Sequence, residues 1–224
     1  APPHAGFQPC VLQQLQDLLE SLPGSSIEKI EVMTNPPPQY ANEQGGVINI
    51  ITVDPALTRG FSVSTSYGNQ NVRDYMLRAG GKIGDLGDIR FTYKQQNDDG
   101  LTNRYDWIDS YFSRLFDVRA DFVLSEKDSL QFSLGQVEGV TQLGRLIPGT
   151  SQSNPYNPIR GLRQTDTYVQ LLWRRVLSPA SDIQLRYSYV ADKSNDAFTV
   201  PLGGNQIFYV NQSGDEGIRH ELEL

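Results

Sequence analysis

Two segments of the sequence gather side chains that could contact a ligand. One contains Tyr105 and Trp107, with Tyr111 just beyond them, and the other contains Tyr156 and Arg160. Each group lies in or beside a long polar stretch, and in a receptor such a group would contact ligand. We therefore predict ligand contacts from these five residues. For the aromatic group, the commoner alternative is a girdle at a membrane interface, and the role of the second group stays equally open.

The sequence contains no catalytic constellation. It has no G-x-S-x-G or H-E-x-x-H motif, no phosphate-binding loop and no pair of cysteines. Its one cysteine, Cys10, and its two histidines, His4 and His220, form no metal-ligand pattern. The Asp-Asp-Gly run at 98–100 lacks the spaced oxygen ligands of a calcium loop, so we predict an ordinary turn. These features predict a protein that is not an enzyme and holds no cofactor or metal.

Charge and hydropathy exclude two further classes of protein. The net charge of the 224-residue chain is −7, whereas nucleic-acid binding needs a basic face, so we predict no nucleic-acid partner. Hydrophobic residues make up 38% of the chain, and no stretch reaches the roughly 18 consecutive apolar residues of a membrane helix. A helical membrane protein is therefore excluded. A membrane β-barrel is not, because its strands are only half apolar.

The first part of the chain predicts a small mixed α/β unit. Residues 11–22 place valine and leucine at helical spacing, and the helix should end at Pro23 and Gly24. Residues 27–32 predict a short strand. Residues 47–53 predict a strand that is apolar on both faces, which must be covered on both sides.

From Gly60 onward the pattern changes to the two-residue period of β-strands. In DIRFTY (88–93), for example, apolar Ile89 and Phe91 alternate with polar Arg90 and Thr92. Tight polar turns alternate with long loops along this part of the chain. The predicted strands are 60–68, 72–84, 87–97, 111–125, 128–143, 164–178, 181–193 and 206–213.

Three features of these strands favour an outer-membrane barrel over a soluble sheet. The strands are longer than the roughly five to six residues usual in globular proteins. Short turns on one side and long loops on the other are the layout of outer-membrane barrels. The polar positions carry arginines suited to a wet or plugged lumen, and of the neighbours Arg174 and Arg175 only one can point inward. Those arginines are Arg90, Arg119, Arg174 and Arg186. The alternative is a soluble β-sheet protein with solvated charges.

Residues 21–55, SLPGSSIEKIEVMTNPPPQYANEQGGVINIITVDP, resemble the C-terminal part of the plug domain of TonB-dependent outer-membrane receptors. In that family an I-E-x-I-E-V strand, a proline-containing loop with a tyrosine, and a G-G-V-I-N-I-I-T strand follow in this order. Many members have Arg-Gly-Pro where this chain has Thr34-Asn35-Pro36. The matching residues here are Ile27, Glu28, Ile30, Glu31, Val32, Pro36, Tyr40, Gly45, Gly46, Val47, Ile48, Asn49 and Ile50.

The resemblance implies a mainly β fold in two parts. Residues 1–55 would be the C-terminal part of an α/β plug, and residues 56–224 the N-terminal portion of an antiparallel transmembrane β-barrel with about eight strands. About 22 strands close a plugged transporter, so the barrel would be incomplete and we expect the chain to be part of a larger receptor. An open sheet would otherwise leave two edges prone to aggregation.

The resemblance also implies a function. The protein would be a receptor in the outer membrane of a Gram-negative bacterium, importing a scarce solute such as a ferric siderophore or another metal chelate. Its partners would be the TonB energy-transducing complex, through a region of the plug not present here, the lipid bilayer with lipopolysaccharide, and the small-molecule ligand. The alternative is a non-transporting soluble or surface β-sheet module for binding or adhesion. A receptor fragment should precipitate without detergent, whereas a soluble module should stay monodisperse.

Overall fold

The computed structural model describes residues 27–33, 47–100, 109–203, 206–211, 213–214 and 217–223. Several predictions from the sequence lie outside these ranges. They are the helix at 11–22, the loop with Pro36, Tyr40, Gly45 and Gly46, and the aromatic residues Tyr105 and Trp107.

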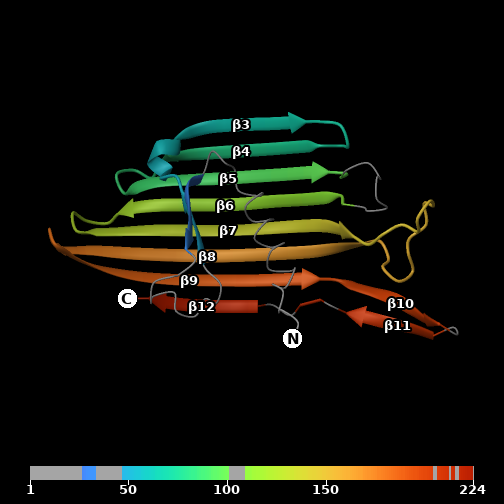
Figure 1. Cartoon of the computed structure of the whole chain (residues 1–224). Helices are drawn as coiled ribbons and strands as arrows, with labels where there is room; N and C mark the ends of the chain where they lie inside the picture. Colours follow the sequence, from blue (N-terminus) through green and yellow to red (C-terminus); the bar gives the residue numbers. More distant parts are fainter. Residues whose placement is uncertain are drawn as a thin grey trace.

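Most of the described chain forms one eight-stranded antiparallel sheet (Figure 1). Successive strands are neighbours, except that β12 pairs with β9 at one edge while β3 forms the other edge. The chain therefore has a mainly β fold built from antiparallel sheets, as the sequence predicted. In spatial order the strands are β12 (Gly217–Glu223), β9 (Ser181–Asn195), β8 (Arg160–Ser178), β7 (Asp128–Leu143), β6 (Tyr111–Val123), β5 (Gly87–Asp98), β4 (Arg73–Lys82) and β3 (Gly60–Tyr67).

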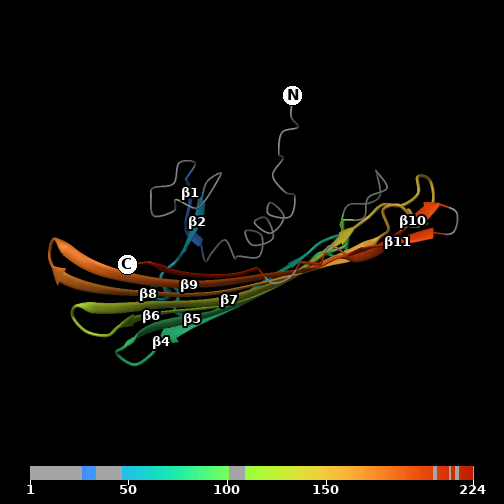
Figure 2. The ribbon, with the colours of Figure 1, turned by 90° about the horizontal axis from the view of Figure 1, so that it is seen from below.

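Two hairpins accompany this sheet. β1 (Ile27–Met33) pairs with β2 (Val47–Thr52), and the short 3-10 helix η3 (Pro55–Thr58) links β2 to the large sheet. β10 (Ala197–Gly203) pairs with β11 (Gln206–Asn211) beyond the end of β9. Figure 2 shows that the large sheet is curved and that the β1–β2 hairpin lies on its concave side.

The alternating pattern located seven strands of the large sheet to within a few residues, and it also located the strand predicted at 206–213. Residues 206–211 form β11, which pairs with β10 and lies outside the large sheet. Gly203, the last residue of β10, has φ of +92°, a conformation that glycine adopts more readily than other residues. The eighth strand of the sheet is β12. It was not predicted, because its charged residues interrupt the alternation of apolar and polar side chains.

The two faces of the sheet have opposite polarity. Arg90 and Arg119 contact the end of β2 and the residue after it. We therefore call the face that carries these two arginines, and the positions in register with them, the inward face. Side chains one residue along point outward. Several inward polar groups on β5 and β6 are buried, with Thr92 only 1% exposed. Outward aromatic groups are exposed, with Phe61 at 73% and Phe91 at 45%. This is the reverse of a soluble protein, which buries its large apolar side chains.

The hairpin and the sheet share a small apolar contact on the inward face. Leu115 and Val137 lie opposite each other on β6 and β7, and both are almost completely buried. Ile27 at the start of β1 packs against them. Polar interactions of Arg90 and Arg119 with Val53 and Thr52 also attach the end of the hairpin to the sheet.

Candidate functional site

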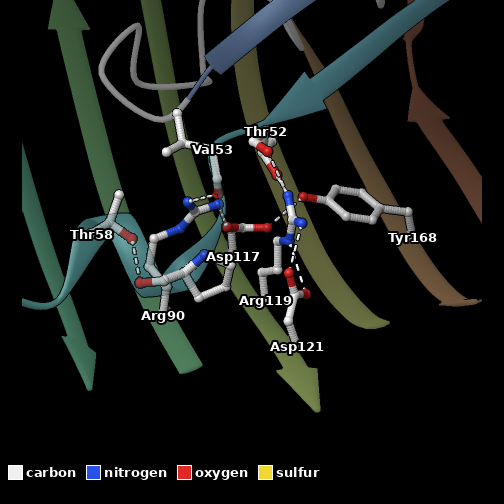
Figure 3. A network of polar contacts seen from close by, with 9 residues as sticks. Thr52, Val53, Thr58, Arg90, Asp117, Arg119, Asp121 and Tyr168 are labelled. Carbon is white, nitrogen blue, oxygen red and sulfur yellow. Dashed lines mark hydrogen bonds and ion pairs between the residues drawn. The ribbon is translucent and has the colours of Figure 1, made fainter. Parts of the chain in front are cut away.

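A cluster of polar side chains lies on the inward face beside the exit of β2 (Figure 3). Its members come from three strands, and the register explains their proximity. Asp117, Arg119 and Asp121 alternate along β6 and so share one face. Arg90 on β5 lies directly opposite Arg119. Together with Tyr168 from β8, these four residues are called the inward cluster below.

Tyr168 reaches the cluster by lying across a glycine. Its hydroxyl donates a hydrogen bond of 2.8 Å to Oδ2 of Asp117, although β7 separates the two strands. The residue between them on β7 is Gly135, which is in register with both. A Cβ atom added to Gly135 would lie 2.2 Å from Cζ of Tyr168. The absence of a side chain at position 135 is therefore what lets the ring lie flat across the strand.

Arg90 is completely buried, at 0% exposure. Its Nη1 donates a hydrogen bond of 2.6 Å to the carbonyl oxygen of Val53, and its Nη2 lies 3.9 Å from Oδ1 of Asp117. Asp117 is thus the acidic partner of a buried guanidinium as well as the acceptor for Tyr168. A buried charge is costly unless it is paired, so Asp117 is essential for this arrangement.

Arg119 uses both sides of its guanidinium group. Nε and Nη2 donate to the two carboxylate oxygens of Asp121 at 3.1 and 2.8 Å. Nη1 donates to the carbonyl oxygen of Thr52 at 2.5 Å and to its Oγ1 at 2.7 Å. Asp121 holds the planar group in place, and the opposite edge of the group binds the end of β2.

The link from β2 to β3 is fixed at further points beyond the cluster. Asp54 accepts a hydrogen bond of 2.7 Å from the backbone nitrogen of Ala56 and so caps η3. The carbonyl oxygen of Thr58 lies so close to β4 that a Cβ atom at Gly80 would be 2.5 Å from it.

Arg59, which follows η3, completes this attachment. Its Nη2 donates a 2.8 Å hydrogen bond to Oδ2 of Asp88. This hydrogen bond raises the pKa of Arg59 above its usual value, against the opposing effect of desolvation. The path from β2 to β3 is therefore attached to the inward face at both of its ends.

The inward cluster has the chemistry of an attachment point. Its acceptors in the hairpin are mainly backbone carbonyl oxygens, which any residue would supply. Among the residues that the structure describes, no group of three or more His, Cys, Asp or Glu side chains could hold a metal ion. The predictions of no enzyme activity, no cofactor and no metal site stay predictions.

No family model, curated protein or solved structure shows a significant match to this chain. In the described ranges, no helix has the length and apolarity needed to cross a membrane. Function must therefore be argued from the polarity of the sheet and the contacts of its inward face.

The predicted plug strands form an antiparallel hairpin. Ile30, for example, is in register with Ile50, and Val32 with Ile48. Glu28 at the start of β1 is exposed. The side chains of 29–33 and 47–50 lie outside the description, so the prediction that the second strand is covered on both faces stays a prediction.

The predicted ligand contacts are separated along the chain. Tyr111 begins β6, whereas Tyr156 lies in the loop between β7 and β8 and is 70% exposed. The guanidinium of Arg160 is held by Asp196 at 2.7 and 3.2 Å, and its carbon lies 3.9 Å from the centroid of the Phe198 ring. Arg160 therefore joins β8 to the start of the β10–β11 hairpin. Ligand binding by these residues stays a prediction. A ligand that binds Arg160 would have to compete with Asp196 for its guanidinium group.

The Asp-Asp-Gly run forms the predicted turn. The backbone nitrogen of Gly100 donates a 2.8 Å hydrogen bond to Oδ1 of Asp98, which closes a local turn. Asp99 accepts a 3.1 Å hydrogen bond from Nδ2 of Asn71. The second contact ties the end of β5 to the turn between β3 and β4.

We expect replacement of Arg119 by alanine to loosen the end of β2. The change removes two hydrogen bonds to Thr52 and leaves Asp121 without its partner. Hydrogen bonds to charged groups contribute about 1.5–3 kcal/mol, so the free energy of local opening should fall by about that amount. Hydrogen exchange of the amides of β2, measured in detergent micelles, would show this as faster exchange.

The matched control is Arg114→Ala on the same strand. Arg114 points outward and donates a 2.9 Å hydrogen bond to Oε2 of Glu138, with 52% of its side chain exposed. Exposed ion pairs contribute about 0–1 kcal/mol, so exchange in β2 should hardly change. Equal acceleration in both variants would mean that Arg119 does not hold the hairpin.

Proposed function

We propose that the large sheet is part of the wall of a transmembrane β-barrel in the outer membrane of a Gram-negative bacterium. The single observation that carries this proposal is the inverted polarity of the sheet. Its outward face exposes large apolar side chains, while its inward face buries arginine, aspartate and threonine. Lipid is the environment in which an exposed apolar face is stable, and a polar interior is characteristic of such barrels.

The outward apolar side chains form a band across the sheet. On β6 the band runs from Phe116 to Phe122, about 20 Å along the strand at roughly 3.3 Å per residue. On β8 it includes Val169, Leu171 and Trp173. On β8, the outward positions toward the long loops, Thr167, Thr165 and Arg163, are polar. Strands of outer-membrane barrels tilt by about 35–45°, so this run would span about 15 Å of their roughly 25 Å apolar band.

The two open edges support a wall that is larger than eight strands. Among the described strands, β3 and β12 each pair on one side only. Unpaired edges are not stable in lipid, because their backbone groups have no water to bond with. In the proposed barrel, further strands cover both edges.

We propose further that residues 1–55 are the C-terminal part of a plug and that the protein is a TonB-dependent receptor. The ordered resemblance of residues 21–55 supports this, and so does the place of the β1–β2 hairpin on the concave side (Figure 2). The receptor would import a ferric siderophore or another metal chelate, with energy from the TonB complex acting on the plug. Lipopolysaccharide would border the barrel on the side of the long loops.

Detergent dependence tests the membrane proposal. We expect the refolded chain to stay dispersed only in detergent micelles or lipid vesicles, and to float with vesicles in a density gradient. Outward residues such as Phe61 and Leu222, at 73% and 71% exposure, would otherwise meet water. A chain that is monodisperse without detergent, and that stays at the bottom of the gradient, would favour the soluble binding module instead.

Gene deletion in the source bacterium tests the import proposal. Under iron starvation, the deleted strain should lose growth on one ferric chelate while it keeps growth on others. Expression of the full-length gene should restore that growth. Unchanged growth and unchanged uptake of labelled chelates across a panel of siderophores would contradict an iron-chelate ligand, and the membrane proposal would stand.

A further inference from the structure

Four charged residues on β5 and β6 form a square on the inward face. On β5, Asp88 and Arg90 are two residues apart, and on β6, Arg119 and Asp121 have the same spacing. In register, Arg90 is opposite Arg119 and Asp88 is opposite Asp121. Like charges directly opposite each other destabilise a sheet, so each carboxylate of the square requires a cationic partner.

The two strands provide these partners in different ways. On β6 the pair is closed, because Arg119 donates two hydrogen bonds to Asp121 (Figure 3). On β5 the pair is open, because Asp88 accepts instead from Arg59, at the end of the segment that joins β2 to β3. The closed pair on β6 shows that the two-residue spacing allows an arginine and an aspartate of one strand to pair. Arg90 therefore lacks a partner that its own strand could supply.

Arg90 is buried with much of its guanidinium group unused. The segment at 53–59, called the link below, lies against β5, and the carbonyl oxygen of Val53 accepts from Nη1 of Arg90. Among the described atoms, Nε and Nη2 of Arg90 are buried without a hydrogen-bond partner. Nη2 is 3.9 Å from Asp117, whose other carboxylate oxygen accepts from Tyr168. Buried donors without acceptors are costly, so attachment of the link carries an unfavourable contribution from Arg90.

We propose that Asp88 exchanges partners when the link leaves the inward face. Asp88 pairs with Arg59 while the link is attached, and with Arg90 once Arg59 has moved away. The released sheet then carries the same closed pair on β5 as on β6, and water reaches Arg90. Both effects stabilise the released state, so the attachment is reversible. In the proposed receptor this contact joins the plug to the wall, and the exchange adds to that function a device by which the wall accepts release of the plug.

Other charged groups near the square do not replace this exchange. Lys82 on β4 lies opposite Asp88, but it is exposed, and exposed ion pairs contribute little. Arg78 on β4 lies opposite Thr92 and has interactions of its own. Its positive charge acts on Arg90, and so favours the pairing of Arg90 with a carboxylate in the released sheet.

The test measures how often the link leaves the sheet. Thr58→Cys, in a chain with Cys10→Ser, places a thiol at a buried position of the link, and Leu57→Cys places one at an exposed position. Both thiols react with a water-soluble maleimide in detergent micelles, but the thiol at 58 reacts only after opening. The ratio of the two rates gives the opening equilibrium, and circular dichroism verifies that each variant is folded.

The two arginines should have opposite effects on this rate. Arg90→Met/Asp117→Asn, compared with Asp117→Asn alone, should slow labelling at 58 by about tenfold, because apolar replacement of a buried charged pair is often stabilising. The released sheet also loses the pair of Arg90 with Asp88. The matched change on β6, Arg119→Met/Asp121→Asn, should accelerate labelling by about tenfold, because Thr52 loses two hydrogen bonds to a charged group.

Faster or unchanged labelling after the replacement of Arg90 would overturn the inference, because Arg90 would then be an ordinary anchor. Asp88→Asn tests the exchange itself. In that background the replacement of Arg90 should slow labelling by less than about threefold, since the two residues are coupled only through their pair. An equal effect with and without Asp88→Asn would also overturn the inference, because Arg90 would oppose attachment through its burial alone.

Thr92→Asn provides a second variant that leaves Arg90 in place. Its amide oxygen, two residues from Arg90, offers an acceptor while the link is attached, so labelling at 58 should slow by roughly threefold. Unchanged or faster labelling would contradict a cost from the unused donors of Arg90. Neither lipid nor a ligand enters this measurement, so a failure of the membrane or import proposals leaves its outcome separate.

Discussion

Replacement of Asp117 by alanine should lower the free energy of unfolding by about 3 kcal/mol, because removal of one partner leaves an uncompensated buried charge. Arg90 is 0% exposed and would lose its acidic neighbour, and the hydroxyl of Tyr168 would lose its acceptor. Chemical unfolding in detergent micelles, followed by circular dichroism, gives the free energy. The free energy of unfolding of Asp117→Asn should lie between those of the native protein and Asp117→Ala. Asparagine keeps a hydrogen-bond acceptor for Tyr168 but removes the negative charge.

The matched control for this prediction is Asp182→Ala. Asp182 also pairs with an arginine, Arg174, but the side chains are 32% and 52% exposed. Water and salt screen such a pair, so its loss should change the free energy of unfolding by at most about 1 kcal/mol. If the two variants lose the same stability, the buried position of Asp117 has no special role and the inward cluster is only another surface network.

Replacement of Gly135 by alanine should also be strongly destabilising, by about 3 kcal/mol. The new methyl group would overlap the ring of Tyr168, with 2.2 Å between Cβ and Cζ. Overpacking of this kind costs about 1–3 kcal/mol, and displacement of the ring also removes its hydrogen bond to Asp117, a further contribution of about 1 kcal/mol. Chemical unfolding in micelles measures the total effect.

Gly139→Ala is the control, on the same strand and the same face. A Cβ atom there would meet only the carbonyl oxygen of Phe112 at 3.7 Å, an ordinary contact. This variant should be neutral or slightly more stable, because alanine loses less chain entropy than glycine on folding. A double-mutant cycle sharpens the test: Tyr168→Phe should cost little once Gly135 is alanine, because the hydrogen bond is already broken. Additive effects would mean that Gly135 and Tyr168 act independently.

The sequence predicted the strands well where one face is apolar and the other polar. The alternation of Leu130, Phe132 and Leu134 with polar neighbours located β7 at 128–143, the bounds that the structure has. It failed for β12, where charged residues interrupt the pattern around Ile218 and Leu222. The strand at 206–213 was predicted and residues 206–211 form β11, but the strand β10 with which it pairs was not predicted.

The inward cluster could be predicted only in part. Spacing along β6 places Asp117 and Arg119 on one face, and Arg90 was already expected on the polar face. The contact of Tyr168 with Asp117 depends on the register of β7 against β8, across a loop of irregular structure. Alternation identifies the face of a residue but not its neighbour on the next strand. The carbonyl oxygens of Thr52 and Val53 belong to the backbone, so no residue type in the sequence indicates that they accept these hydrogen bonds.

The measurement that tests the central claim most directly is the environment of consecutive residues along β8. Single cysteines at Val169, Gln170, Leu171, Leu172 and Trp173, in a chain with Cys10→Ser, would carry nitroxide labels in lipid vesicles. Collision rates with oxygen report lipid, and those with a water-soluble nickel chelate report water. An outward apolar wall predicts that labels at 169, 171 and 173 collide mainly with oxygen, whereas those at 170 and 172 are shielded from lipid. Labels that show no alternation, or that all collide with the aqueous reagent, would contradict the proposal that this face of the sheet contacts lipid.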